Sequence, residues 1–288
     1  MERIMIYKAA AAVAAAVLPL TSCVMDVLYN TPHPEAGVVV MTADFTQRSQ
    51  TADVPAEYNV SHACCGPVDI CAMPSAVGKS LPWFLQPETH TFYAWTSCKG
   101  MKADGVTVKV EETATGKIES LPGHLFTARH DVVAAKDDTV RVDVPMAQRT
   151  RDLQFNLTVT EGDPELIASV AGELSGIAGT FSLADQKVAG EPAAMDLTFD
   201  RNGASLTSSA RLLGTMGPAQ KLSLEIRFTD RADVHKVEVD LTDALSGFGS
   251  DMLTARVVTG NVETPIGMDA TAEITGWKDV DGDPAVAD

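Results

Sequence analysis

Short segments in which apolar and polar residues alternate recur along the whole chain. The clearest of them covers residues 148–160, where four apolar residues share one face: Leu153, Phe155, Leu157 and Val159. Period-two alternation places one set of side chains in a core and the other in water, which is typical of a half-buried strand. Because turn residues separate these segments and helical windows are few, we expect an all-β chain built from sandwiches.

The same pattern predicts further strands on both sides of this segment. In the first half they cover residues 37–45, 54–63, 89–97, 106–112 and 138–145. In the second half they cover residues 176–183, 195–199, 205–213, 221–228, 234–241, 253–259 and 268–277. Residues 167–174 fit either a strand or a helix, and residues 243–248 fit one helical turn.

The best domain boundary lies near residue 147, where one strand ends and the next begins without a long linker. A chain of 288 residues is long enough for two domains. We therefore predict an N-terminal β-sandwich over residues 37–147 and a C-terminal β-sandwich over residues 148–278. The acidic tail, residues 279–288, is expected to fray.

The beginning of the chain has the layout of a bacterial export signal. Arg3 and Lys8 form a short basic region, and residues 9–20 are an unbroken run of mostly small apolar residues. This run is too short for a membrane-spanning helix, which needs about 20 residues, but it has the right length for a signal peptide. The following LTSC, residues 20–23, resembles the lipobox of bacterial lipoproteins, which implies cleavage before Cys23 and a lipid on its sulfur.

We therefore predict a signal peptide of residues 1–22 and a lipid-anchored tether of residues 23–36. One acyl chain gives only marginal anchoring, whereas two or three hold a protein on a membrane effectively. The alternative is a soluble exported protein in which Cys23 carries no lipid. No later segment reaches the 18 apolar residues of a candidate transmembrane helix.

The formal net charge of −17 restricts the partners of this chain. An acidic surface repels the phosphates of nucleic acids, so we expect no nucleic-acid partner. The same charge repels anionic lipid headgroups, which favours a body that stands off the membrane on its tether.

Four cysteines follow Cys23, namely Cys64, Cys65, Cys71 and Cys98. Export permits disulfides, so these four residues are candidates for one or two bridges, whose connectivity the sequence does not decide. A metal site that includes His62 is the alternative. The spacing is not that of a zinc ribbon, and no second half follows, so we expect no bound metal and no cofactor.

The chain has none of the common catalytic motifs. His130 precedes Asp131, but neighbours in a strand point to opposite faces, so this adjacency does not predict a catalytic dyad. We expect a protein that is not an enzyme. Four aromatic residues are candidates for a sugar-binding platform, although Tyr93 and Trp95 share a face and therefore also suit a core; the four are Trp83, Tyr93, Trp95 and Trp277.

The order of these segments resembles that of the fimbrillin-related anchor and minor subunits of Bacteroidales fimbriae. The matching segments are GVVVMTADF at residues 37–45, TFYAWTS at 91–97, DDTVRVDVPM at 137–146, QRTRDLQFNLTV at 148–159, ELSGIAGTFSL at 173–183, RLLGTMGPAQKLSLEIRF at 211–228 and ATAEITGW at 270–277. The resemblance covers nearly all of the chain after the tether, through loose strand patterns of which none is specific alone.

The resemblance implies two tandem transthyretin-like antiparallel β-sandwich domains in a lipoprotein of the cell outer membrane. It implies a surface-exposed fimbrial anchor or accessory subunit in cell adhesion, which binds other fimbrial subunits by strand addition. Residues 37–45 and 268–277 are the candidate strands, and Arg48 is a candidate site for an arginine-specific protease. An anchor is expected to keep the segment that carries its lipid, so we do not predict cleavage there. The alternative function is a surface glycan-binding lipoprotein of a polysaccharide-uptake system.

Overall fold

The computed structural model describes residues 35–63, 70–232 and 234–264, and the backbone of residues 273–281. The predicted signal peptide, Cys23, Cys64 and Cys65 lie outside these ranges. The residues from Ala36 onward form one unit. None of the helices in the described ranges is long and apolar enough to cross a membrane.

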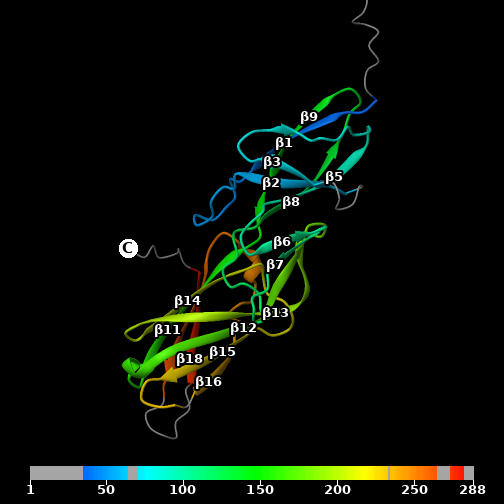
Figure 1. Cartoon of the computed structure of the whole chain (residues 1–288). Helices are drawn as coiled ribbons and strands as arrows, with labels where there is room; N and C mark the ends of the chain where they lie inside the picture. Colours follow the sequence, from blue (N-terminus) through cyan, green and yellow to red (C-terminus); the bar gives the residue numbers. More distant parts are fainter. Residues whose placement is uncertain (1–34, 64–69, 233, 265–272, 282–288) are drawn as a thin grey trace, which may run out of the picture. The chain divides into compact units, whose positions relative to one another are not determined.

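The first part of the fold is a sandwich of two sheets (Figure 1). The smaller, three-stranded sheet has the order β4 (Lys79–Ser80), β1 (Val38–Asp44) and β9 (Thr139–Pro145). The larger, five-stranded sheet has the order β10 (Ala147–Gln148), β8 (Phe126–Val133), β5 (Thr89–Trp95), β2 (Glu57–His62) and β3 (Ile70–Pro74).

The core of this sandwich forms because alternate residues of both sheets point inward. Val39 and Met41 of β1 share a buried cluster with Phe92 of β5. The rings of Phe45 and Phe126 meet edge to face, with their centroids 5.3 Å apart. Burial of such side chains supplies the main favourable term in folding.

The second part is one ten-stranded sheet that closes over a larger core. Its order is β16 (Val234–Asp240), β15 (Lys221–Phe228), β12 (Ile167–Ser182), β13 (Lys187–Asn202), β14 (Ser205–Leu212), β11 (Arg151–Glu161), β17 (Arg256–Glu263) and β18 (Glu273–Asp281). Two further strands, β6 (Met101–Asp104) and β7 (Thr107–Val110), pair with each other, and β7 also pairs with β12. Short 3₁₀ helices cover Pro164–Leu166 and Phe248–Ser250.

The long strand β13 connects the two faces of this second sandwich. It pairs with β12 along most of its length, and only residues 200–202 at its end pair with β14. Phe155 of β11 and Phe199 of β13 pack in the core with ring centroids 6.0 Å apart. Residues of the first half also enter this core, including Trp95 and Val108.

Among the described strands, two pairs are parallel, whereas the other ladders are antiparallel. β1 runs parallel to β9, and β11 runs parallel to β17. Parallel neighbours need a long connection between them, so each pair joins segments that are distant in sequence. The all-β sandwich prediction is confirmed, with these two parallel pairs added to the expected antiparallel arrangement.

Most predicted strands are present, but two predicted segments are joined in one element. Residues 167–174 form a strand, which continues through residues 176–183 as β12. Register shifts near Gly176 bend this strand. Gly176 has φ +75°, and a Cβ there would lie 2.1 Å from the carbonyl oxygen of Ala219, so the bend requires glycine.

Among the described residues, sequence reasoning missed five strands and misplaced several ends. The missed strands are β3, β4, β6, β8 and β10. Residues 243–247 form turns, and the 3₁₀ helix begins only at Phe248. The last strand continues to Asp281, beyond the predicted start of the tail at residue 279. The division into two domains at residue 147 stays a prediction.

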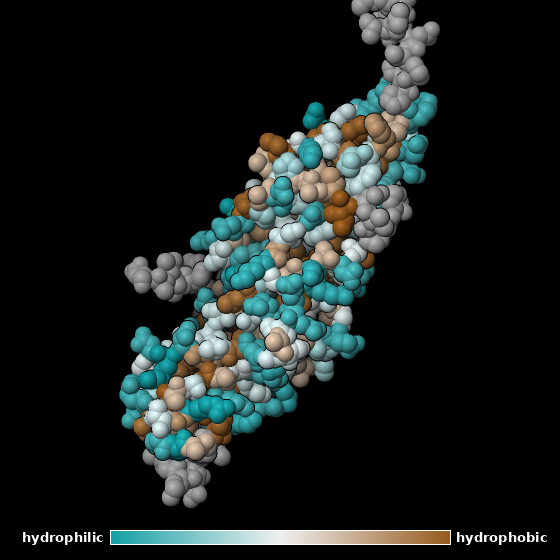
Figure 2. Space-filling view, viewed as in Figure 1, coloured by the Kyte–Doolittle hydropathy of each residue, from teal (hydrophilic) through white to brown (hydrophobic). Residues whose placement is uncertain are grey.

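Figure 2 shows a mostly hydrophilic face with hydrophobic residues scattered over it. Inward-facing alternation explains this surface, because the polar positions of each strand remain in water. The described outer positions include charged pairs between neighbouring strands. Lys221 and Glu238 are 2.7 Å apart, as are Lys236 and Glu225.

Candidate assembly surface around the first strand

The first strand fills a groove between two segments that come later in the chain. β1 pairs with β9 on one side and with β4 on the other. The amide of Gly37 donates to the carbonyl of Leu85, and Leu85 donates back to Gly37. The side chains of Val39 and Met41, on the inner face of β1, are buried. β1 is therefore an internal strand of its sheet, stabilised by main-chain hydrogen bonds and by its apolar face.

Residues 37–45, one of the two candidate segments for strand addition, are thus not at an edge of their sheet. As long as β1 is in place, its groove is closed to a strand from another molecule. The other candidate segment, at residues 268–277, overlaps the last strand. β18 borders the ten-stranded sheet and pairs with β17 among the described residues.

Tyr58 ties β1 to the opposite sheet. Its hydroxyl donates to the carbonyl oxygen of Met41 at 3.4 Å. Burial, together with a smaller contribution from the nearby Cys71, raises the pKa of Tyr58 to about 12. The phenol therefore stays protonated at neutral pH and keeps its donor.

The loop that follows β1 is held by its own arginine. Arg48 donates from Nε to the carbonyl oxygen of Ala52 at 3.2 Å and from Nη1 to that of Phe45 at 3.1 Å. Both ends of the loop, residues 45–52, are thereby tied to one side chain. The guanidinium that a protease would have to bind is engaged within the loop.

The same loop is fastened to the second half of the chain by two contacts. The amide of Ser49 donates to Oε1 of Gln148 at 2.9 Å. The hydroxyl of Thr51 donates to Oδ2 of Asp152 at 3.0 Å. Arg211 donates to the other oxygen of Asp152 at 2.6 Å, which fixes the carboxylate. We call the Ser49–Gln148 and Thr51–Asp152 contacts the loop clamp.

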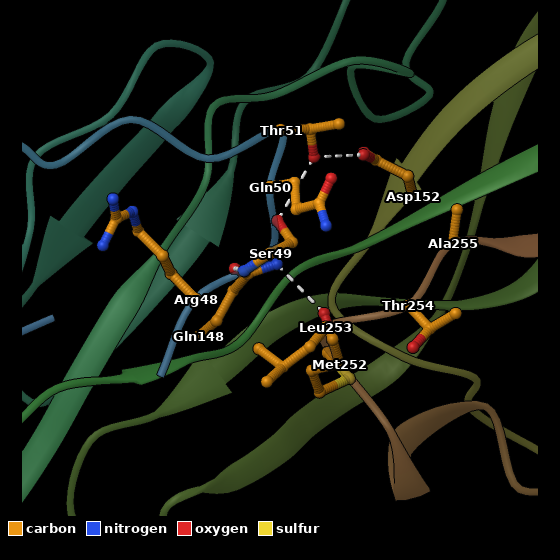
Figure 3. Close-up of a pocket in the computed structure, with 10 residues that line it drawn as sticks. All are labelled: Arg48, Ser49, Gln50, Thr51, Gln148, Asp152, Met252, Leu253, Thr254 and Ala255. Carbon is orange, nitrogen blue, oxygen red and sulfur yellow. Dashed lines mark hydrogen bonds between the residues drawn. The ribbon is translucent and has the colours of Figure 1, made fainter. Parts of the chain in front are cut away.

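A polar pocket of about 240 Å³ lies beside the loop clamp (Figure 3). The loop lines one side, and residues 252–255 line the other. Gln148 stands between them and donates to the carbonyl oxygen of Met252 at 3.0 Å. Arg48 points away from Asp152 in this view. The pocket therefore offers amides and hydroxyls rather than an assembled set of catalytic groups.

The structure brings no cysteines together within the described residues. Cys71 and Cys98 are half-buried free thiols. Burial raises the pKa of Cys98 to about 11, and the positive charge of Arg211 opposes this effect only in part. A thiol with such a pKa is a poor nucleophile at neutral pH. Because Cys64 and Cys65 lie outside the described ranges, the disulfide prediction remains a prediction.

The proposed aromatic platform is not assembled in the described part of the chain. Trp95 is only 3% exposed and belongs to the second core, against which Tyr93 also packs. Trp83 packs instead against the first core. The side chain of Trp277 lies outside the described residues.

The remaining candidate catalytic and metal-binding residues also form no assembled site among the described residues. His130 and Asp131 are consecutive in β8, and Asp131 accepts from the hydroxyl of Thr91 at 2.6 Å. Among the described residues, no group of three His, Cys, Asp or Glu side chains is placed to hold a metal ion.

Sequence reasoning missed a buried pair of histidines next to the groove. Nε2 of His62 and Nδ1 of His90 are 2.9 Å apart, and Nε2 of His90 donates to the carbonyl oxygen of Gln86 at 2.9 Å. The His62 ring stacks on Phe92. His90 lies two residues before Phe92, whose side chain faces the core. Because residues two apart in a strand share a face, this spacing places His90 on the core face as well.

Comparison with protein families adds to this geometry. Residues 85–282 match the family model described as "Fimbrillin-A associated anchor proteins Mfa1 and Mfa2". The match covers more than half of the chain. A search of curated protein sequences finds no match.

Three solved structures show the same fold. The fimbrial anchor protein Mfa2 from Porphyromonas gingivalis has a TM-score of 0.62 at 11% identity, over 86% of this chain and 98% of that one. A candidate adhesin from Bacteroides ovatus has a TM-score of 0.60 at 14% identity, over 89% and 98%. A candidate polysaccharide-binding protein from Bacteroides thetaiotaomicron has a TM-score of 0.53 at 12% identity, over 79% and 90%. The matched family model and its agreement with the strand pattern lead to one conclusion: this chain belongs to the family of fimbrillin-A associated anchor proteins Mfa1 and Mfa2.

Proposed function

We propose that this protein is an outer-membrane lipoprotein that anchors a fimbrium, or serves as its accessory subunit, in cell adhesion. The observation that carries the proposal is the position of β1, which fills its own groove between β4 and β9. In the sequence, β1 is the first described strand after Cys23. A chain that fills this groove with its own strand cannot accept a neighbour's strand there. Growth of a polymer by strand addition would therefore end at this groove.

Retention of β1 keeps the lipid on the protein. Cleavage after Arg48 would separate Cys23 from everything that follows β1. The loop clamp and the two hydrogen bonds of Arg48 oppose this cleavage, because a protease needs the arginine side chain and an extended backbone in its own site. These contacts support the proposal that the anchor remains intact.

Contact with the next fimbrial subunit is proposed to use a sheet edge away from the closed groove. β18 is nine residues long and borders the ten-stranded sheet. An added strand would gain main-chain hydrogen bonds along this edge. The partners of this protein are then the membrane, through its N-terminal lipid, and another fimbrial subunit, through strand addition.

The test compares the wild-type chain with Cys23→Ala in the native host. Cells are labelled with a clickable palmitate analogue, and membrane and sheared-surface fractions are blotted for this protein. We expect the variant to lose the label and leave the membrane, while the wild-type protein shears together with a fimbrial ladder. An unlabelled wild-type protein that stays on the membrane like the variant would contradict the lipid anchor. A labelled protein without a fimbrial ladder would contradict the fimbrial role.

A further inference from the structure

A second pocket, of about 280 Å³, adjoins the pocket of Figure 3, and Met252 lines both of them. The charged residues that line the second pocket are two cations, Arg149 and Lys187. Its described lining includes no Asp or Glu, whereas the pocket of Figure 3 contains Asp152. The whole chain has 39 acidic and 22 basic residues. A hollow that gathers two cations and no carboxylate in such an acidic chain favours an anionic ligand.

The guanidinium of Arg149 is held in a defined orientation at this pocket. Its Nε donates to the hydroxyl oxygen of Thr127 at 2.9 Å, and its Nη2 donates to Oε1 of Gln186 at 2.6 Å. The central carbon of the guanidinium lies over the ring of Phe181, 5.3 Å from the ring centroid. Within the described ranges, Nη1 donates to no residue, so its N–H groups remain available to a ligand.

Gln186 keeps this arrangement in a backbone conformation that is unusual for its residue type. Its φ is +54°, in the left-handed region that residues other than glycine rarely adopt. Its side chain accepts from Thr127 and Arg149, and its Nε2 donates to the carbonyl oxygen of Leu183 at 2.7 Å. Residues in such conformations cluster at binding and catalytic sites. The turn between β12 and β13 therefore agrees with a ligand site here.

The protein itself does not neutralise the two cations. Among the residues that the structure describes, neither Arg149 nor Lys187 forms an ion pair with a carboxylate. Burial lowers the pKa of Arg149, and no acidic group opposes this effect. The guanidinium nevertheless stays charged at neutral pH. A charge that is partly removed from water without a counter-ion is unfavourable, and a bound anion would supply the missing partner.

We propose that this pocket binds the carboxylate of a small molecule with a single negative charge. Arg149 binds the carboxylate through charge-assisted hydrogen bonds, and the exposed Lys187 adds a second positive charge. Three apolar residues of the lining contact the rest of the ligand, namely Val188, Leu213 and Met252. The site is independent of the proposed lipid anchor and fimbrial role, because neither of them uses these residues.

The size of the pocket and the charge of the protein both favour a small ligand. Most pockets for drug-sized ligands measure about 300–1,000 Å³, and this one lies just below that range. An acidic polypeptide would be repelled by the net charge of −17, whereas a molecule with one charge meets much less repulsion. The carboxylate can belong to a short aliphatic acid or to an acidic sugar, and the experiment distinguishes these two sources.

The experiment titrates the chain from residue 23 onward, which contains the whole unit that begins at Ala36, with sodium butyrate or sodium glucuronate. NMR follows the backbone amide signals of Gly214 and Gly249, which line the pocket. Butyramide and glucose are the matched neutral compounds, and sodium chloride keeps the ionic strength constant. We expect a saturable shift with at least one of the two carboxylates and no shift with its neutral counterpart.

Two variants test the two cations separately. Arg149→Lys should weaken binding by roughly tenfold, because lysine keeps the charge but lacks the planar fork of the guanidinium. Lys187→Met should weaken binding by roughly threefold, because an exposed charge contributes less. Lys99→Met is the matched control for net charge, since Lys99 is exposed and does not line the pocket. Urea unfolding verifies that each variant is folded, and Lys187→Met carries the test if Arg149→Lys is not.

The absence of a saturable shift with both carboxylates would overturn the proposal and leave Arg149 with a structural role only. Equal affinities of Lys187→Met and Lys99→Met would also contradict it, as would chloride that binds as well as the carboxylates. An acidic peptide that binds more tightly than both small acids would overturn the assignment to a small ligand. Binding of butyrate alone assigns the site to aliphatic acids, and binding of glucuronate alone assigns it to acidic sugars.

Discussion

The amide of Ser49 donates a 2.9 Å hydrogen bond to the side-chain oxygen of Gln148, 99 residues later in the chain. Gln148 is only 4% exposed, and its Nε2 donates to the carbonyl oxygens of Thr150 and Met252. One side chain thus satisfies three backbone groups from three segments. This contact fastens the loop after β1 to the junction between the two halves of the chain.

Gln148→Ala is therefore expected to destabilise the protein. The variant leaves buried donors and acceptors without their partner, which costs about 1–3 kcal/mol. Urea unfolding would show this as a lower midpoint. Gln50→Ala is the control, because Gln50 is exposed and lines the same pocket. Equal midpoints for the two variants would contradict the role of the clamp.

The same variant is expected to expose the Arg48–Ser49 bond to an arginine-specific protease. Cleavage of a native loop follows the population of its open form when opening and closing are fast. Loss of the Gln148 contact should raise the cleavage rate at this bond by roughly tenfold, since 1.4 kcal/mol corresponds to a factor of ten. N-terminal sequencing of timed digests measures this rate.

Thr46→Ala is the control for the digestion, because Thr46 is an exposed residue of the same loop. Its rate should equal that of the wild-type chain. If the wild-type loop were cut as fast as Gln148→Ala, the clamp would not protect Arg48.

Trp95→Ala is expected to destabilise the second core. The stability of this variant shows whether Trp95 has a role in core packing or in glycan binding. Trp95 is buried among apolar residues, and such a truncation costs about 3–5 kcal/mol. The matched control is Phe84→Ala, which should change the stability by less than about 0.5 kcal/mol because Phe84 is exposed. Thermal or urea unfolding measures both. A Trp95→Ala variant of native stability would return this residue to the list of candidate ligand-binding residues.

The ion pairs of Lys117 are expected to make stability depend on acid pH. Lys117 lies 2.7 Å from Asp196 and 2.5 Å from Glu173. Its hydrogen bond lowers the pKa of Asp196, although burial opposes this shift. A lowered pKa in the folded state means that the contribution is present above the unfolded value near 4 and is lost as the pH falls through the folded value.

Lys117→Met should thus destabilise the protein at pH 7 and have less effect near pH 3. Because the side chains are partly exposed, the difference at pH 7 should stay below about 1 kcal/mol. Urea unfolding of both proteins between pH 3 and pH 7 provides the comparison. A difference that does not shrink toward pH 3 would show that packing of the lysine stem, and not charge, stabilises this site.

The buried histidine pair is expected to weaken the fold in mild acid. Burial lowers the pKa of His62, and the neighbouring His90 lowers it further, while Glu88 opposes both. A histidine with a lowered pKa in the folded state stabilises the fold above its unfolded value near 6.5 and loses this contribution as the pH falls through that value toward the folded pKa.

NMR titration should place the midpoint of His62 below 6.5. Unfolding free energy should fall between pH 7 and pH 5, and His62→Gln should flatten this dependence because it removes the titrating group. A His62 midpoint above 6.5, or equal pH dependence in both proteins, would show that the pair does not control stability in this range.

Several features of the fold could be predicted because they follow from local alternation. The apolar residues of β11 are buried at every second position, as its sequence indicates. β9 likewise points its valines toward the core side, with charged residues between them. Alternation identifies a strand and its buried face, since burial of that face is the dominant driving force.

The strand β8 escaped this reasoning because it is covered on both faces at one end. Phe126, Thr127 and Ala128 are all buried, which hides the period of two. Thr127 is buried because Arg149 and Gln186 of other segments bond to its hydroxyl. Such cover is supplied by residues remote in sequence, so the strand itself carries no sign of it.

By itself, the sequence determined most of the strands, the buried faces of those that alternate, and that the chain resembles fimbrial anchor proteins. Only the tertiary structure decided that β1 lies parallel to β9 inside a closed groove, that Gln148 clamps the following loop, and that Arg151 is buried with its guanidinium donating to the carbonyl oxygens of Phe248 and Thr254. Alternation describes one strand at a time. Strand pairing, closure of a groove and burial of a charge each depend on groups from distant segments. These interactions contribute to stability only when the tertiary structure brings those segments together.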